Sequence, residues 1–356
     1  MAHDLIIGIE TSCDETAAAV VRGGTEVLSN VVHSQVDVHR EWGGVVPELA
    51  SRHHVEQIDL IFNLALERAG IKVGQVEAVA ATYGPGLVGA LLVGVSAAKA
   101  MALTMGVPFV GIDHVEAHIH SLALTHGPPH YPSLSLVVSG GHTSLFYQRR
   151  QFDYELIGRT RDDAAGEAYD KVAKMLGLGY PGGPVLDRLA DLGDPNSYHF
   201  TPVKMSDGSL DFSFSGLKTA VLHLTRKNPD LLKREVPPEE DQPLLGLVAS
   251  FQAAVVREIV ARIEAVMDER GALSVGVSGG VANNAGLRAA MESLSARRGV
   301  PVLLPDVAYT SDNAAMVAAL AWHKLRRDGP SPLDLNPVAN LRLAEPPGAK
   351  RHPRSG

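Results

Sequence analysis

The two halves of the sequence open in the same way, with Gly8-Ile9-Glu10-Thr11-Ser12 after an apolar run from Leu5 and with Val138-Ser139-Gly140-Gly141-His142-Thr143 after an apolar run from Leu134. Each stretch predicts a buried strand, a short polar or glycine turn and a second strand. Such turns expose backbone N–H groups that can hold phosphate oxygens. Two of them on either side of a cleft would grip the phosphate chain of a nucleotide.

A third glycine turn, Ser278-Gly279-Gly280, separates a strand predicted at 273–277 from a helix that begins at Asn283. The end of a strand is a preferred place for a nucleotide in an α/β sheet. One glycine turn alone usually serves only to reverse the chain, but three of them at strand ends indicate a nucleotide-binding α/β fold.

The rest of the chain alternates between strands and helices. We predict further strands at 17–21, 76–82, 109–112, 143–147 and 302–304, and helices at 47–69, 86–106, 242–270 and from Asp312. The stretch from Pro128 to Pro132 has the composition of a linker. We therefore expect an N-terminal domain at 1–132 and a second domain with helical insertions at 133–310. The helix at 311–328 returns to the first domain, and residues 329–356 form a Pro-rich, flexible tail.

A pair of histidines stands in His114-Val115-Glu116-Ala117-His118, with Asp113 at the N-cap position of the helix that these residues begin. Residues four apart lie on one face of a helix, so both imidazoles can bind one metal ion. Imidazole suits zinc, iron, copper and nickel, so the pair alone does not identify the metal. The alternative interpretation is a helix face that carries two ordinary histidines.

The same motif differs from the H-E-x-x-H pattern of zinc peptidases, in which the general base directly follows the first histidine. Glu116 comes two residues after His114, which is about 200° around a helix of 3.6 residues per turn. We therefore predict that Glu116 points away from the metal and that the chain lacks the base of a peptidase.

Composition narrows the class of protein. The 356 residues fit two domains, and the net charge of −8 excludes a protein that binds nucleic acid through bulk basic charge. The single cysteine, Cys13, excludes an internal disulfide and fits a reducing cytosol. The N-terminus lacks the basic region of a signal peptide. The apolar run at 86–106 contains four glycines and Lys99, which favours a buried helix over a membrane span. We expect a cytoplasmic location.

A series of short motifs runs in order from Leu5 to about Trp322. They are Gly8-Ile9-Glu10-Thr11-Ser12-Cys13-Asp14-Glu15-Thr16, Gly43-Gly44-Val45-Val46-Pro47-Glu48-Leu49-Ala50-Ser51-Arg52, Gly84-Pro85-Gly86-Leu87, His114-Val115-Glu116-Ala117-His118, Val138-Ser139-Gly140-Gly141-His142-Thr143, Asp162-Asp163-Ala164-Ala165-Gly166-Glu167-Ala168-Tyr169-Asp170-Lys171, Tyr180-Pro181-Gly182-Gly183, Phe212-Ser213-Phe214-Ser215-Gly216-Leu217-Lys218, Gly279-Gly280-Val281-Ala282-Asn283-Asn284 and Ser311-Asp312-Asn313-Ala314-Ala315. The sequence thereby resembles the TsaD family, tRNA adenosine threonylcarbamoyltransferases of the actin/hexokinase superfamily that are related to the archaeal and eukaryotic Kae-type proteins. The resemblance implies two actin-like (RNase H-like) ATPase domains that face a nucleotide- and metal-binding cleft.

The resemblance implies that His114, His118 and Asp312 bind one divalent metal ion, with Fe²⁺ preferred over Zn²⁺. A carboxylate beside two imidazoles leaves coordination positions open for substrate oxygens. Without the resemblance, Asp312 would be assigned as a helix N-cap, the commonest role of Asp before a helix.

By resemblance, a second group of residues surrounds the adenylate. Asp170 and Asp187 suit ribose hydroxyls, and Asn284 can offer a donor and an acceptor to an adenine edge. Taken singly, these residues would be helix caps or surface carboxylates. The whole implied group is Val137, Val138, Ser139, Gly140, Gly141, Asp170, Gly183, Asp187 and Asn284.

The implied reaction transfers the threonylcarbamoyl group of threonylcarbamoyl-adenylate to the exocyclic N6 amine of the adenosine beside the anticodon, in tRNAs that read codons beginning with A. Backbone amides at 139–141 would hold the leaving phosphate, and close placement of amine and carbonyl would supply much of the acceleration. Asp14 and Glu15, on the first hairpin turn, are the candidate catalytic residues for the proton of the amine. A solvated turn is the alternative, and we assign Cys13 to packing.

Expected partners are tRNA, a TsaB-like paralogue, a TsaE-like P-loop ATPase and the synthase that supplies the threonylcarbamoyl-adenylate, with no membrane. The paralogue would pair with the apolar faces of the helices at 47–69 and 86–106. Three other classes of protein stay open. A sugar or acetate kinase would leave the histidine helix unexplained, a metallopeptidase is disfavoured by the position of Glu116, and a non-enzymatic ATP-binding scaffold would have lost the metal ligands.

Overall fold

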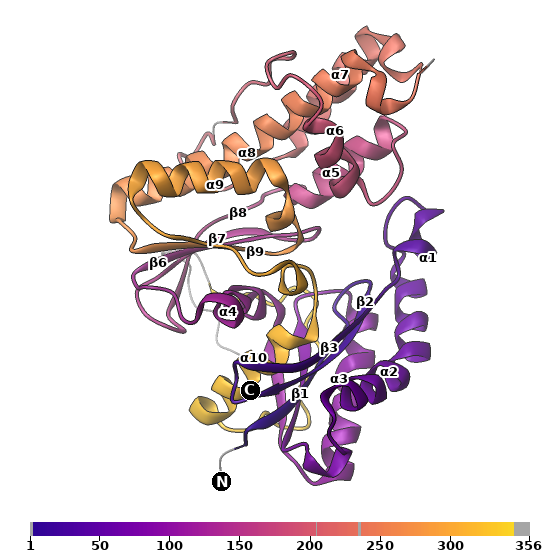
Figure 1. Ribbon diagram of the computed structural model, residues 1–356, viewed down its shortest axis with the longest axis vertical. Coiled ribbons are helices and arrows are strands. Elements are labelled where there is room, and N and C mark those ends of the chain that lie inside the picture. Colours follow the sequence, from indigo (N-terminus) through magenta and orange to yellow (C-terminus); the bar gives the residue numbers. More distant parts are fainter. Residues whose placement is uncertain (1–2, 204, 234–235, 345–356) are drawn as a thin grey trace. The chain divides into compact units, whose positions relative to one another are not determined.

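The structure is a computed structural model that describes residues 3–203, 205–233 and 236–344. Contacts divide the chain into two compact units (Figure 1). The first unit runs to Pro128 and also includes Pro305–Leu343, and the second unit contains Pro129–Leu304. The chain therefore leaves the first unit once and returns to it near its end.

The first unit is built on a five-stranded mixed sheet with the order β3-β2-β1-β4-β5. Strand β1 pairs antiparallel with β2 and parallel with β4, and β5 continues the parallel part. Because β1, β4 and β5 are parallel, their carboxyl ends meet at one edge of the sheet. The strands are β1 (Leu5–Glu10), β2 (Glu15–Arg22), β3 (Glu26–Ser34), β4 (Ala78–Gly84) and β5 (Phe109–Asp113).

Helices cover both faces of this sheet. Ile7 and Ile9 share a core cluster with side chains of α2 and α3, whereas a Cβ at Gly8 would lie 2.7 Å from the Ala314 carbonyl oxygen of α10. Neighbouring residues of a strand point to opposite faces, so α10 covers the face opposite α2 and α3. The helices of this unit are α1 (Val36–Arg40), α2 (Pro47–Ala69), α3 (Val88–Met105), α4 (His114–His126) and α10 (Ala314–Asp328), with short 3₁₀ turns at Val73–Gln75 and Val307–Tyr309.

The second unit repeats the same sheet. Its order is β10-β9-β6-β7-β8, with β6–β7 antiparallel and β6–β9 parallel, so β6 occupies the position that β1 has in the first sheet. The similar openings of the two halves of the sequence thus correspond to a repeated sheet topology. The strands are β6 (Ser133–Val138), β7 (Thr143–Gln148), β8 (Tyr154–Arg159), β9 (Ser274–Ser278) and β10 (Val302–Leu303).

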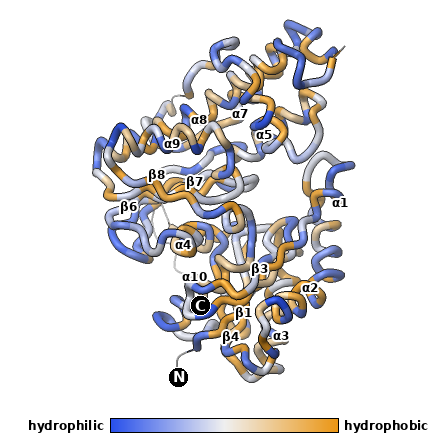
Figure 2. The backbone as a smooth tube through the Cα atoms, viewed as in Figure 1, coloured by the Kyte–Doolittle hydropathy of each residue, from blue (hydrophilic) through white to orange (hydrophobic). Residues whose placement is uncertain are grey.

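Inserted helices enlarge the second unit. The long helix α8 contributes Leu244, Phe251 and Ile259 to one large core cluster with strand residues such as Leu136 and Val277. Figure 2 shows the apolar residues concentrated along the strands and along the helices that pack on them. The helices are α5 (Ala165–Met175), α6 (Gly182–Ala190), α7 (Ser215–Lys227), α8 (Gln242–Arg270) and α9 (Ala285–Arg298), with 3₁₀ turns at Pro229–Leu232, Pro238–Glu240 and Gly280–Asn283.

The segment after α10 differs from the flexible tail expected at 329–356. Within its described part, Ser331 N–H donates to the Phe109 carbonyl oxygen at 2.8 Å, and Val338 N–H donates to the Tyr83 carbonyl oxygen at 2.8 Å. Leu335 packs against the core of the first unit. These backbone bonds at the β4 and β5 strands hold the segment in place despite its lack of periodicity. Residues 345–356 lie outside the described part of the chain.

Two helices, α3 and α8, are long and apolar enough to cross a membrane by length and composition. In α8, 78% of the apolar window is buried, as in the core helix of a globular unit, whereas in α3 the buried share is 33%. The exposed side of α3 therefore needs a separate explanation.

Candidate active site

The residues of the predicted metal site come from two elements of the first unit. His114 and His118 lie on α4, which begins directly at the carboxyl end of β5, and Asp113 caps this helix by accepting from Glu116 N–H at 3.0 Å. Asp312 lies two residues before the start of α10. The N-cap of α10 is Asn313, whose side chain accepts from Met316 N–H at 3.1 Å. Asp312 is therefore not the cap, and its carboxylate is available to the histidines.

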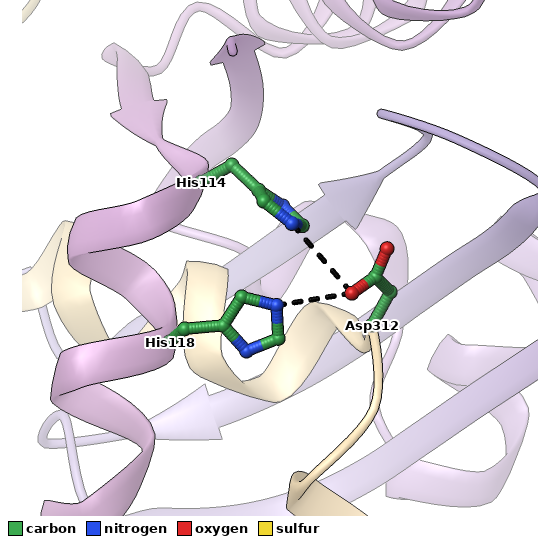
Figure 3. A group of neighbouring side chains, drawn as sticks. All are labelled: His114, His118 and Asp312. Atoms are coloured by element: carbon green, nitrogen blue, oxygen red, sulfur yellow. Dashed lines mark hydrogen bonds and ion pairs between the residues drawn. The ribbon is translucent and has the colours of Figure 1, made fainter. Parts of the chain in front are cut away.

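The three side chains converge on one point (Figure 3). One oxygen of Asp312, Oδ1, lies 3.0 Å from His118 Nε2 and 3.6 Å from His114 Nε2. The possible ligand atoms all lie within 4.8 Å of one another, and both histidines are buried. Two imidazole nitrogens and one carboxylate oxygen in a buried group fit a divalent transition metal.

The charges around His114 favour a cation. Burial lowers the pKa of His114, but the carboxylates of Asp312 and Glu10 outweigh that effect and raise this pKa to about 9. A positive charge is therefore stabilised where the two histidines meet Asp312. This is the electrostatic environment that a metal cation requires.

Glu116 points away from the metal site, as its helical position predicts. Its Oε2 atom accepts from Lys324 Nζ of α10 at 2.7 Å, and its side chain is only 4% exposed. The carboxylate thus joins α4 to α10 as a structural ion pair. A peptidase that used this helix would have no general base at the metal, so the structure gives no support to that class.

The hairpin turn between β1 and β2 carries Asp14 and Glu15. Burial raises the pKa of Glu15 well above its ordinary value, and the nearby charges of Asp14 and Asp312 raise it further. The turn and Asp312 are thus close enough to interact electrostatically. A carboxylate with a raised pKa is a stronger base than an ordinary one, which suits a group that takes up a proton.

A buried histidine on α2 holds this turn. His54 Nε2 donates to the Cys13 carbonyl oxygen at 2.9 Å, and Thr16 Oγ1 lies 2.8 Å from His54 Nδ1. Because a carbonyl only accepts, Nδ1 is the unprotonated nitrogen and accepts from the Thr16 hydroxyl. Burial also raises the pKa of the Cys13 thiol, which agrees with a packing role.

The predicted phosphate turn is the β6–β7 connection of the second unit. Val137 and Val138 are buried strand residues, and Gly140 and Gly141 are exposed. Ser139 N–H is already used, since it donates to the His142 carbonyl oxygen at 2.7 Å. Gly140 and Gly141 remain as the predicted positions whose amides can face a phosphate.

Two glycines of neighbouring elements allow other backbone segments to approach this turn. A Cβ at Gly279, where φ is +93°, would lie 2.4 Å from the Val138 carbonyl oxygen. A Cβ at Gly166 of α5 would lie 2.7 Å from the Ser139 carbonyl oxygen. Side chains at either position would push the turn out of place.

The predicted adenylate residues of α5, α6 and α9 also belong to the second unit. A Cβ at Gly183 would meet no atom within 4 Å, and Asp170 Oδ1 accepts from Gly182 N–H at 2.7 Å. Asp187 accepts from Ala285 N–H at 3.0 Å and from Asn284 Nδ2 at 2.7 Å. The structure therefore brings Asp187 and Asn284 together and engages Asp170 at the start of α6.

Gln252 of α8 is a member of this group that the sequence did not reveal. Its Oε1 atom accepts from Asn284 Nδ2 at 2.7 Å, and its Nε2 atom donates to Asp187 Oδ1 at 3.1 Å. Asn284 Oδ1 accepts from Leu287 N–H at 2.8 Å, so its amide is fully oriented. Gln252 carries no motif signal because it lies within a long apolar helix.

Comparison with known proteins identifies the family. The family model described as TsaD, tRNA N6-adenosine threonylcarbamoyltransferase, matches residues 26–319. A protein of that name from Symbiobacterium thermophilum is 48% identical, covering 96% of this chain and 98% of the relative. One from Anaeromyxobacter dehalogenans is 51% identical, covering 95% of this chain and 99% of the relative.

Solved structures confirm the predicted fold class. The structure of HypF from T. kodakarensis has a TM-score of 0.59 at 15% identity, covering 92% of this chain and 48% of that one. At this identity the likeness concerns the fold alone. Because the family model and both relatives extend over most of the sequence, the chain belongs to the TsaD family of tRNA N6-adenosine threonylcarbamoyltransferases.

Proposed function

We propose that this chain performs its family's transfer to N6 of adenosine in tRNA with a metal site in its first unit and an adenylate site in its second. The donor is threonylcarbamoyl-adenylate, and the acceptor is the adenosine beside the anticodon. The observation that carries the proposal is the convergence of His114, His118 and Asp312 in a buried, cation-favouring position of a chain from this family.

His114, His118 and Asp312 would hold one divalent ion. When bound, such an ion supplies a Lewis acid that orients and polarises substrate oxygens. Two histidines and one carboxylate are the donor set typical of non-haem iron(II), so we prefer Fe²⁺ over Zn²⁺. A protein-bound ion with three protein ligands keeps positions open for the donor.

Residues of the second unit bind and orient the adenylate. The amides of the exposed Gly140 and Gly141 would donate to the phosphate of the adenylate, which leaves as AMP. Carboxylates at Asp170 and Asp187 would accept from ribose hydroxyls, with Val137, Val138, Ser139 and Gly183 shaping the site. Asn284 donates twice within the protein, so we assign it to holding Asp187 in place.

Transfer forms a bond between the N6 amine and the carbamoyl carbon and breaks the bond from that carbon to the phosphate oxygen. The amine must lose a proton as it becomes an amide-like nitrogen. Glu15, whose pKa is raised by burial, would accept that proton, and Asp14 would maintain the polarity of the turn. Holding both substrates in reach supplies much of the rate enhancement.

Partner proteins would cover apolar side chains that α2 and α3 expose. Val55 and Leu60 of α2 and Val88, Leu92 and Leu103 of α3 are large apolar side chains that are more than half exposed. We assign these exposed side chains to the contact with a TsaB-like paralogue, because apolar groups that gather on a surface mark contacts with other proteins. A TsaE-like P-loop ATPase and the synthase that makes the adenylate complete the set, in the cytoplasm.

The test is reconstitution with purified threonylcarbamoyl-adenylate, tRNA and partners, followed by mass spectrometry of the tRNA nucleosides. We expect threonylcarbamoyl-adenosine to form and to require metal. If every combination fails and a sugar or acetate is phosphorylated instead, the chain is a small-molecule kinase. Equal multiple-turnover rates with and without partners would contradict the partner assignment alone.

A further inference from the structure

Glu10 is a fully buried carboxylate beside the metal site. It ends β1, and no part of the residue is exposed. Its Oε1 atom accepts from Ser12 N–H at 2.5 Å, and its Oε2 atom accepts from Thr82 Oγ1 at 2.6 Å. Oε2 also lies 3.1 Å from His114 Nδ1. The parallel strands β1, β4 and β5 bring these groups together, because their carboxyl ends share one edge of the sheet.

A carboxylate without exposure is costly unless it is hydrogen-bonded or paired. Ser12 and Thr82 supply donors, but neither carries charge. His114 Nδ1 is the third group within hydrogen-bond distance of this carboxylate.

The contact determines which nitrogen of His114 carries hydrogen. An ionised carboxylate can only accept, so Nδ1 must be the donor. The Ser12 hydroxyl lies 3.2 Å from the same nitrogen, and toward a protonated Nδ1 it can act only as an acceptor. Nε2, on the other side of the ring, faces Asp312 Oδ1 at 3.6 Å.

The second histidine has no such support. His118 directs Nε2 to Asp312 Oδ1 at 3.0 Å, but its Nδ1 atom is buried with no hydrogen-bond partner among the described residues. Among the described residues, the Nδ1 atom of His114 therefore has a carboxylate partner and the Nδ1 atom of His118 does not. Because metal-binding histidines usually donate their other N–H to an oriented acceptor, this asymmetry marks Glu10 as part of the site.

We propose that Glu10 is a positioning residue of the metal site. It would keep the ring hydrogen of His114 on Nδ1, so that Nε2 faces the ion, and it would place a negative charge on the side of the ring away from the ion. The inference rests on the proposed metal site at His114, His118 and Asp312. Two neutral imidazoles, the carboxylates of Glu10 and Asp312 and a divalent cation sum to zero charge. Removing the Glu10 charge leaves a net positive buried group.

The test compares two buried glutamates. Glu10→Gln and Glu116→Gln make the same chemical change in side chains that are each less than 5% exposed, but Glu116 pairs with Lys324 away from the ligands. Zn²⁺ affinity would be measured by competition with a chromogenic chelator. We expect Glu10→Gln to weaken binding about 10–100-fold, the usual effect of outer ligand partners, and Glu116→Gln to leave it near that of the parent.

A second readout reports on the ring itself. In the Zn²⁺-loaded protein labelled with ¹⁵N-histidine, the His114 Nδ1 proton should resonate downfield because a carboxylate accepts it. Glu10→Gln should move that signal upfield. If Glu10→Gln does not fold, Thr82→Val, which removes only the 2.6 Å hydrogen bond to Glu10, should weaken Zn²⁺ binding by a smaller factor.

The outcomes separate this inference from the metal site itself. A wild-type protein that binds no Zn²⁺, or a His114→Ala/His118→Ala variant that still binds it stoichiometrically, overturns the proposed site. Zn²⁺ binding that is lost in the double variant but unchanged in Glu10→Gln and Thr82→Val overturns only the role of Glu10. Equal losses in Glu10→Gln and Glu116→Gln would do the same, because they would reflect general destabilisation.

Discussion

At the scale of single residues, neighbouring side chains can exchange the roles that a sequence suggests. Asp312 and Asn313 are both good helix caps, and from sequence alone Asp312 is the expected one. The structure gives the cap to Asn313, which bonds Met316 N–H, and turns Asp312 toward His118. Hydrogen-bond geometry, which no residue pattern encodes, decides between the two.

This exchange predicts opposite effects for two adjacent substitutions. Asp312→Asn should lower metal affinity by more than the roughly 10–100-fold lost when a residue that hydrogen-bonds to a metal ligand is changed, with little loss of stability. Asn313→Ala should lower the free energy of unfolding by about 1 kcal/mol through loss of the cap and largely retain metal. Urea unfolding of the metal-free proteins and chelator competition measure the two effects. Similar metal loss in both variants would show that the cap, not the carboxylate, controls the site.

At the scale of elements, the long helices were the most predictable part of the chain. The helices α2 and α8 have the bounds expected from sequence, because proline marks the first turn and Gly70 or Gly271 follows the end. The strands β3 and β8 lie at sheet edges and were missed, as were the shorter helices α5 to α7. His114 and His118 are four residues apart, so the sequence alone predicts that they share one helix face. Glu10 is 104 residues from His114, so only the sheet topology brings them together.

Contact between α10 and β1 depends on Gly8. A Cβ there would lie 2.7 Å from both the Ala314 carbonyl oxygen and the Ala318 nitrogen. We expect Gly8→Ala to destabilise the protein by about 1–3 kcal/mol through overpacking, and to weaken metal binding because α10 begins two residues after Asp312. Gly74→Ala is the matched control, since a Cβ at Gly74 meets nothing within 4 Å. Urea unfolding measures the stability and chelator competition measures the metal affinity. A Gly8→Ala variant with unchanged stability and metal affinity would show that α10 does not pack tightly on Gly8.

Helix α8 should orient the adenylate site through Gln252. In Gln252→Leu, Asn284 loses the acceptor of one N–H and Asp187 loses a donor, so we expect a stability loss of about 1–3 kcal/mol and weaker binding of an adenylate analogue. Gln148→Leu removes a comparable buried amide, bonded to Ser135 in the same unit. Calorimetric titration should show weaker binding only for Gln252→Leu. Equal binding by both variants would remove Gln252 from the site.

At the scale of the whole molecule, one sheet topology has been used twice with different chemistry. In the first unit, Glu10, Thr82 and His114 lie at the carboxyl ends of the parallel strands, beside the candidate metal site. In the second unit the equivalent ends carry Ser139 and Gly279, which form tight turns. The motifs of each half predicted where these turns and the histidine helix lie, while Asp312 comes from near the end of the chain, just before α10.

The distribution of charge predicts that tRNA does not bind at one conspicuous arginine pair. The net charge is −8, and the adjacent Arg297 and Arg298 of the second unit are paired with Glu264 and Asp268. A paired cluster offers little net charge to phosphate. We expect Arg297→Gln/Arg298→Gln to leave the salt dependence of tRNA binding unchanged, whereas two lost phosphate contacts would reduce its slope by about 1.4–1.8. Filter binding across a salt series measures the slope, and a reduction of that size would place tRNA on this cluster.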